Sequence, residues 1–342
     1  MLFLQNIMLL RHLVMKENRR TCYLNSNDGS GILGFGDGPY LRLDDVNCFE
    51  DIEQFTTKYN NSYIFALFSY DLKNEIENLS SNNSDEIGFP AVVLWCPEVV
   101  VRISNHQYEY VQGVEKDEHN DFISSILNEN TVADLKETVS FSPRTSKEKY
   151  LDTVNKLKEH IQKGDIYEVN YCQEYISYNT DIKHINNTYV NLNKITKAPF
   201  SCLFHFDEFA VFSCSPERFL QKDHLHLIAQ PIKGTSKRGI NDAEDKSLIE
   251  SLQNDPKERS ENIMIVDLMR NDLSKVAEKN TVKVDELCEI YSFETVHQMI
   301  STVSCQVKKE HSFVDILKAT FPMGSMTGAP KIRAMELIEQ YE

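Results

Sequence analysis

The spacing of apolar residues marks one clear helix in the second half of the chain. They recur three and four positions apart, at Tyr150, Val154, Leu157 and Ile161. Such spacing places side chains on one face of a helix. Ser146 precedes the pattern as an N-cap and Gly164 follows it as a terminator. The pattern therefore predicts an amphipathic helix over residues 146–163.

Two further segments carry helix signals. Asp255 followed by Pro256 has the order of a cap and a first helical residue, and Glu258 lies three residues after the cap, as in a capping box. The segment PKIRAMELIEQYE (330–342) also has the pattern of a helix. We therefore predict helices starting after Asp255 and after Pro330.

Short apolar runs broken by Gly, Asn and Asp predict strands elsewhere. In the first half they are GILGFGDGPY (31–40), SYIFALFSY (62–70) and AVVLWCPEVVVRI (91–103). In the second half they are IYEVNYCQEYISY (166–178), PFSCLFHFDEFAVFSCSPERFL (199–220), HLHLIAQPIKGT (224–235) and VHQMISTVSCQV (296–307). Runs of strands with segregated helices favour an α+β fold over a doubly wound parallel sheet.

The length of 342 residues exceeds what one core usually organises, so we expect either two lobes or one large layered domain. The polar stretch that ends at Ser142 and Pro143 places their boundary, giving residues 1–142 and 143–342. The apolar start, MLFLQNIMLLRHL, is interrupted by Arg11 and His12 and is too short to span a membrane. We expect it to face the core of a cytoplasmic protein.

Charge and cysteine usage narrow the possible partners. Lys and Arg number 36 against 52 Asp and Glu, so the formal net charge is −16. This charge repels phosphate backbones and anionic membranes, and we expect neither a nucleic acid nor a membrane as partner. The eight cysteines are scattered without the spacing of a zinc site, which is typical of buried thiols in a reducing compartment.

Carboxylates on a predicted helix form the first candidate site. In DPKERSENIMIVDLMRNDL (255–273), Glu258, Glu261 and Asp272 share a helical face with apolar residues. Carboxylates on a core-facing stripe need a cation, and Mg²⁺ accepts a few protein carboxylates while leaving positions for substrate oxygens. Spacing alone allows another interpretation, in which Glu258 only caps the helix and Glu261 pairs with a neighbouring Lys or Arg in solvent.

Three other residues combine reactive chemistry with a strand end or interior. Lys233 lies in a Pro-Ile-Lys-Gly-Thr turn, where desolvation would make it a nucleophile, although this pattern alone favours a surface lysine. Glu217 follows a proline and would serve as a general acid if buried, or pair with Arg218. His297 could orient a substrate anion or be a satisfied core histidine.

Six ordered motifs together resemble one family, the chorismate-utilising enzymes. They are GDIYEVNYCQ (164–173), SPERFL (215–220), PIKGT (231–235), ENIMIVDLMRNDL (261–273), VHQM (296–299) and FPMGSMTGAPKIRAME (321–336). The family includes anthranilate synthase component I, aminodeoxychorismate synthase component I, isochorismate synthase and salicylate synthase. The resemblance implies antiparallel sheets packed in layers with helices on the outside.

The resemblance also implies roles for individual residues. It makes Glu261 the Mg²⁺ ligand, with Glu258 beside it in the metal and substrate shell. It makes Glu217 the general acid that assists departure of the C4 hydroxyl. The expected chorismate contacts are Gly234, Thr235, His297 and Thr327.

Two positions favour one branch of the family. The residue before Gly234 is usually alanine in the anthranilate, isochorismate and salicylate branches, whereas here it is Lys233, as in many aminodeoxychorismate synthases. Water-using members carry a lysine where this chain has Glu168, and ammonia-using members usually carry glutamine there. The missing lysine disfavours isochorismate chemistry, and the resemblance leaves the role of Glu168 open.

The expected function is therefore the Mg²⁺-dependent amination of chorismate at C4 on the route to p-aminobenzoate and folate. The sequence shows no Cys-His-Glu triad for releasing ammonia, so the expected donor is a separate glutamine amidotransferase subunit. The alternatives are anthranilate synthase component I and a non-catalytic protein of the same fold that docks an amidotransferase.

The family pattern continues past the segment that matches residues 330–342. The resemblance implies a Gly-Tyr strand segment, an arginine that grips chorismate and a second metal-binding glutamate beyond Glu342. We therefore expect residues 1–342 alone to turn over chorismate slowly or not at all.

Overall fold

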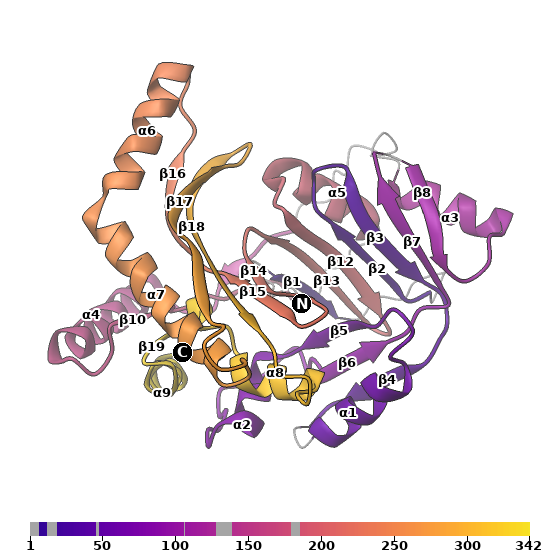
Figure 1. Ribbon diagram of the computed structural model, residues 1–342, viewed down its shortest axis with the longest axis horizontal. Helices are drawn as coiled ribbons and strands as arrows, with labels where there is room; N and C mark the ends of the chain where they lie inside the picture. Colours follow the sequence, from indigo (N-terminus) through magenta and orange to yellow (C-terminus); the bar gives the residue numbers. More distant parts are fainter. Residues whose placement is uncertain (1–6, 12–18, 46–47, 106, 128–138, 179–184) are drawn as a thin grey trace.

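The computed structural model describes residues 7–11, 19–45, 48–105, 107–127, 139–178 and 185–342. Helices and antiparallel sheets are segregated, which confirms the predicted α+β class. Figure 1 shows the largest sheet on one side of the molecule and a second sheet, backed by two long helices, on the other.

The largest sheet has seven strands and combines distant parts of the chain. Its order is β1 (Ile7–Arg11), β13 (Phe209–Ser215), β12 (Phe200–Phe206), β2 (Thr21–Asn25), β3 (Ser30–Phe35), β7 (Val99–Ser104) and β8 (Gln107–Gln112). In the register between β2 and β12, Tyr23 lies opposite Leu203. The boundary predicted after residue 142 thus crosses a sheet that takes strands from both sides of it. Of the apolar N-terminal segment, β1 joins this sheet, and the remainder lies outside the described residues.

Both faces of the seven-stranded sheet are covered. One face packs on helices α3 (Asp117–Leu127) and α5 (Ile185–Thr196). The other packs on a three-stranded sheet of order β4 (Tyr40–Leu43), β6 (Val92–Trp95) and β5 (Phe65–Phe68), where Trp95 and Phe65 meet Phe204. Helices α1 (Phe49–Lys58) and α8 (Phe313–Thr320) cover the outer face of that smaller sheet. This arrangement confirms the layered sheets with outer helices.

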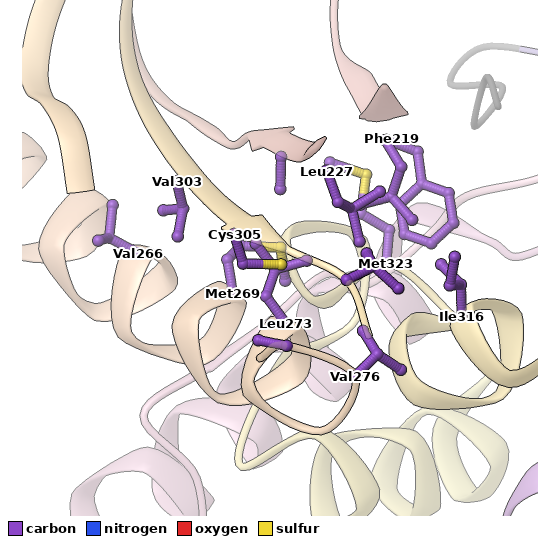
Figure 2. Packing of buried hydrophobic residues seen from close by; sticks show 14 of the residues in the cluster. Phe219, Leu227, Val266, Met269, Leu273, Val276, Val303, Cys305, Ile316 and Met323 are labelled. Carbon is purple, nitrogen blue, oxygen red and sulfur yellow. The ribbon is translucent and has the colours of Figure 1, made fainter. Parts of the chain in front are cut away.

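The second body of the fold is a five-stranded sheet backed by a long helix. The strands β14 (Arg218–Asp223), β15 (His226–Gln230), β16 (Ile232–Lys237) and β17 (Lys283–Ser292) are arranged around the long strand β18 (Val296–Gln306). Helix α7 (Pro256–Ser274) lays Val266, Met269 and Leu273 against Val303 and Cys305 of β18 (Figure 2). Helix α6 (Asp242–Asn254) precedes α7 at the outer edge (Figure 1).

The remaining elements complete the fold. They are the 3₁₀ turns η1 (Tyr70–Leu72) and η3 (Gly324–Met326), helices α2 (Lys73–Ile76), α4 (Lys147–Lys163) and α9 (Lys331–Tyr341), and strands β9 (Ser142–Pro143), β10 (Glu168–Val169), β11 (Tyr175–Ile176) and β19 (Gly328–Ala329). The single strand predicted over 166–178 is wrong in extent, because only β10 and β11 pair, with β19 and β9 respectively. The pairing of β10 with β19 brings the segments around residues 168 and 328 together.

The predicted helix starts are largely confirmed. Ser146 accepts a hydrogen bond from the Lys149 N–H, and Gly164 ends α4 in the left-handed conformation at φ 81°. Asp255 caps α7 by accepting from the N–H groups of Lys257 and Glu258. The predicted capping box is wrong, because the Asp255 N–H donates to the Leu252 carbonyl rather than to Glu258.

The helices of the described ranges include none that is long and apolar enough to cross a lipid bilayer.

Candidate active site

Three segments far apart in the sequence meet at the amine of Lys233. The lysine is on β16, and its Nζ contacts Oε1 of Glu168 on β10. The same Nζ donates to the backbone carbonyl of Ser325 in η3, with 3.3 Å between the atoms. The side chains of Lys233 and Glu168 are 15% and 16% exposed. Lys233 is therefore an enclosed residue with a carboxylate partner, not a surface lysine extended into water.

Glu217 lies in the turn between β13 and β14 and is almost completely buried. It accepts hydrogen bonds from the Ser325 hydroxyl at 2.6 Å and from the Ile232 N–H at 3.2 Å. Burial raises the pKa of its carboxyl to about 7, against the opposing effects of these two donors and of Lys233. Arg218 donates a hydrogen bond to the Gln221 side chain at 2.6 Å. A carboxyl with this pKa carries a proton for a substantial part of the time at neutral pH and can donate it.

Ser325 joins these groups, and the sequence analysis did not single it out. Its carbonyl accepts from both Lys233 and the Asn170 side chain, the latter at 2.9 Å, and its hydroxyl reaches Glu217. Both Asn170 and Ser325 lie inside two of the six family-like motifs, and this position is the feature of the sequence that could have identified them as site residues. Ser325 fixes the distance between the candidate nucleophile and the candidate acid.

Two glycines allow the close approach of backbones at this site. Gly234 has φ +95°, and a Cβ there would lie 3.2 Å from the Glu258 Cβ. Gly328 has φ +149°, and a Cβ there would lie 2.2 Å from the Glu168 carbonyl oxygen. Both conformations and both contacts favour glycine. The predicted substrate contact Gly234 therefore lies directly against Glu258 of α7.

Both predicted metal ligands, Glu258 and Glu261, pair with Lys257, which is the pairing that the alternative interpretation expected for Glu261. The Lys257 ammonium lies 3.2 Å from Glu258 Oε1 and 3.0 Å from Glu261 Oε1. Both carboxylates are half-buried, and Mg²⁺ commonly uses only one or two protein carboxylates. Within the described part of the chain, His, Cys, Asp and Glu form no group of three or more that could hold a metal. A magnesium site at these two glutamates therefore stays a prediction.

Asp272 belongs to a different cluster than the sequence analysis expected. It is buried and pairs with Lys331, and with Lys275 at 3.0 Å. Burial lowers the pKa of the Lys331 amine, and Asp272 opposes this shift. The stripe of three carboxylates therefore divides into a possible metal pair and a structural ion pair.

Asp272→Asn is expected to destabilise the fold by about 3–5 kcal/mol, because it leaves the Lys331 charge buried without a counterion. Urea unfolding at pH 7 measures this loss. The control is Asp267→Asn on the same helix, whose exposed partner is Arg270 at 2.8 Å. A loss for Asp272→Asn no larger than that of the control would contradict the structural role of the pair.

His297 is enclosed and fully hydrogen-bonded. Its Nδ1 lies 2.8 Å from the Ser292 hydroxyl and its Nε2 lies 2.9 Å from Asp245 Oδ1. Asp245 is anchored in turn by Arg238 and the Gly239 N–H. In this arrangement neither ring nitrogen is open to a substrate carboxylate, so the predicted contact would require Asp245 to release the ring.

The two predicted threonine contacts have different surroundings. Thr235 is exposed on β16 opposite Gln298. Thr327 is buried, and its hydroxyl donates to the Gly324 carbonyl at 3.1 Å. Asn170 and Thr327 also line a cavity of about 900 Å³ between β5 and β12, whose walls are mainly apolar. The described lining of that cavity does not include Lys233, Glu217 or Glu168.

The layered fold carries a buried acid, an enclosed lysine and two paired glutamates. Comparison with known proteins shows which class of enzyme has this fold. The chorismate binding enzyme family matches residues 18–342, and the chain belongs to this family. The solved structure of anthranilate synthase component I from Streptococcus pneumoniae TIGR4 covers 100% of this chain and 79% of its own, with a TM-score of 0.72 and 21% identity. The menaquinone-specific isochorismate synthase MenF of Escherichia coli gives a TM-score of 0.67 at 13% identity, covering 98% and 78%. These likenesses confirm the chorismate-binding fold.

Curated relatives are more similar in sequence. Aminodeoxychorismate synthase component 1 of Klebsiella aerogenes is 35% identical over 280 residues, and that of Escherichia coli K12 is 35% identical over 290 residues. Each alignment covers 81% of this chain and 61% of the relative. Anthranilate synthase component 1 of Aquifex aeolicus is 38% identical over 200 residues, covering 58% and 40%. The chain thus spans about three fifths of the length of the first two relatives.

Proposed function

We propose that this protein aminates chorismate at C4 in a magnesium-dependent reaction that leads to p-aminobenzoate and folate. The observation that carries the proposal is the enclosed amine of Lys233, held beside the buried acid Glu217 by Ser325. A lysine nucleophile distinguishes this chemistry from direct attack by water or ammonia. The relatives named aminodeoxychorismate synthase component 1 support the same assignment.

The first step is the attack of the neutral Lys233 amine on C2 of chorismate. As the N–C2 bond forms, the two ring double bonds shift from C1=C2 and C5=C6 to C1=C6 and C4=C5, and the C4–O bond breaks. Protonated Glu217 donates its proton to the departing oxygen, so that water leaves rather than hydroxide. Glu261, with Glu258 beside it, would hold Mg²⁺, which would supply a Lewis acid for the C1 carboxylate.

The second step reverses the allylic shift. Ammonia forms a bond to C4, both double bonds move back to C1=C2 and C5=C6, and the C2–N bond to Lys233 breaks. The ammonium formed at C4 returns a proton to Glu217 and leaves the amine product. Two substitutions of this kind replace one difficult displacement, as in other covalent mechanisms.

The proposed ammonia source is a separate glutamine amidotransferase subunit. Component 1 in the names of the relatives denotes one part of a multicomponent enzyme. The test of the function is product analysis by mass spectrometry, using the full-length protein with chorismate, ammonium and Mg²⁺. We expect 4-amino-4-deoxychorismate, and its absence in the presence of bound chorismate would reject the proposal.

A second candidate is anthranilate formation, which is favoured by the relative from Aquifex aeolicus. The same product analysis separates the two, because anthranilate is aromatic and carries its amine beside the carboxylate. Addition of an aminodeoxychorismate lyase discriminates further, since only the proposed product is then converted to p-aminobenzoate.

Glu261→Gln is expected to weaken Mg²⁺-dependent chorismate binding on the order of tenfold or more, because a neutral amide is a poor ligand for a hard cation. Calorimetry with and without Mg²⁺ measures the effect, and urea unfolding checks that the fold is intact. Asp267→Asn removes an exposed carboxylate from the same helix and is expected to bind normally. Unchanged metal affinity in Glu261→Gln would remove this residue from the site.

A further inference from the structure

Glu168 is a half-buried carboxylate whose two oxygens have different surroundings. Its Oε1 contacts the Lys233 amine, whereas its Oε2 is buried without a hydrogen-bond partner. Leaving a buried carboxylate oxygen unpaired costs free energy, so such an oxygen calls for an explanation. The unpaired oxygen lies on the group that contacts the candidate nucleophile.

The backbone around Glu168 is held in place. In the pairing of β10 with β19, Glu168 lies opposite Ala329. The Tyr167 N–H donates to the Ala329 carbonyl at 2.7 Å, and the Asn170 N–H donates to the Thr327 carbonyl at 2.9 Å. The carboxylate therefore meets Lys233 from a fixed position.

The mechanism requires a proton acceptor beside Lys233. A lysine ammonium has no lone pair, so it must lose a proton before it attacks carbon. The Ser325 carbonyl accepts a hydrogen bond but cannot keep the proton. Glu217 must enter the first step protonated in order to donate to the leaving oxygen. Glu258 lies against Gly234 instead. Among the charged groups of the described residues, Glu168 is the one that forms an ion pair with the Lys233 amine, so it is the available acceptor.

We propose that Glu168 takes the proton of Lys233 in the first step and returns it in the second. The N–H bond of the lysine breaks and an O–H bond forms on Glu168, which frees the nitrogen lone pair for C2. When ammonia bonds to C4, the C2–N bond breaks and Glu168 protonates the departing lysine amine. The resting ion pair is restored, and the overall reaction remains chorismate and ammonia to product and water.

The inference rests on the proposed function, since it assigns a proton to each step of that mechanism. The role depends on a carboxylate at position 168. A glutamine there could hold the lysine by a hydrogen bond but could not exchange a proton with it.

The test compares wild type with Glu168→Gln in single turnovers without ammonia, using the full-length protein with Mg²⁺ and chorismate. Intact-protein mass spectrometry follows the adduct on Lys233. We expect the rate of adduct formation to fall on the order of 10²-fold, the usual effect of losing an acid–base group. Below about pH 7, where Glu217 keeps its proton, the variant should also gain a rise of about tenfold per pH unit that wild type lacks, because its lysine must lose the proton to solvent.

Controls separate proton transfer from positioning. Glu174→Gln removes a nearby carboxylate that bonds Arg144 at 2.7 Å, and its adduct rate should match wild type. Glu168→Asp keeps a carboxylate with a shorter reach and should retain the wild-type pH dependence at a reduced rate, which tests the idea even if Glu168→Gln folds poorly.

The outcomes distinguish this inference from the function beneath it. If wild type forms the adduct and Glu168→Gln shows the same rate and pH dependence, the role of Glu168 is overturned while the proposed function stands. If wild type makes the aminated product with no adduct on Lys233 at any time, the lysine mechanism fails and the inference fails with it.

Discussion

Replacing Lys233 by alanine is expected to lower the rate of amination on the order of 10³-fold or more, because it removes the proposed nucleophile. Chorismate binding should change much less, because we expect Mg²⁺ and residues other than Lys233 to hold the carboxylates of chorismate. The variant also introduces the alanine that the resemblance implies for the anthranilate and isochorismate branches. It therefore tests whether Lys233 is needed for amination but not for chorismate binding.

Steady-state kinetics with ammonium, together with calorimetry for chorismate, measures both parts of this prediction. Lys237→Ala is the matched control, because Lys237 lies on the same strand with a side chain that is 74% exposed. It should retain the amination rate. Full amination by Lys233→Ala would make the lysine a positioning residue and would remove the covalent route.

Glu217→Gln is expected to act in opposite directions on activity and stability. Amination should fall by about 10²–10⁴-fold, because glutamine cannot donate a proton to the leaving oxygen. Stability should rise at pH 8. Burial raises the pKa of the Glu217 carboxyl from its ordinary value near 4.5 to about 7. The stabilisation of the fold by the neutral carboxyl is therefore fully present below pH 4.5 and is lost as pH rises through 7.

The stability part has a defined size and pH window. Wild type should lose on the order of 3 kcal/mol at this site between pH 4.5 and pH 7, whereas glutamine stays neutral throughout. The glutamine carbonyl can still accept from Ser325 and the Ile232 N–H. Urea unfolding at pH 4.5 and pH 8 should show equal stabilities at the lower pH and a more stable variant at the higher. A variant less stable than wild type at both values would show that the carboxyl is not held neutral.

The local elements of the fold were largely predictable from the sequence, because caps and apolar spacing act within a few residues. Ser146, Gly164 and Asp255 each end or start a helix where their chemistry indicates. Pairing between distant strands was not predictable by these rules. Nothing in the alternation of residues 21–25 specifies that they lie beside residues 200–206.

The candidate site shows the same division. Motif resemblance selected Lys233 and Glu217, and the structure places both at Ser325. The sequence could not assign Asp272 to Lys331, because the partner lies 59 residues away. It also could not show that Asp245 and Ser292 occupy both nitrogens of His297, since those contacts depend on the turns between β16, α6, β17 and β18.

The position of β2 in the large sheet constrains the order in which this protein can fold. Its neighbour β3 follows at once, but its other neighbour, β12, begins at Phe200. During synthesis one edge of β2 therefore stays unpaired until that later hairpin leaves the ribosome. Pairings between residues so distant in sequence form slowly, and an open strand edge is a template for association with other chains. The first part of the chain has to remain unassociated until the strands that complete its sheet have been made.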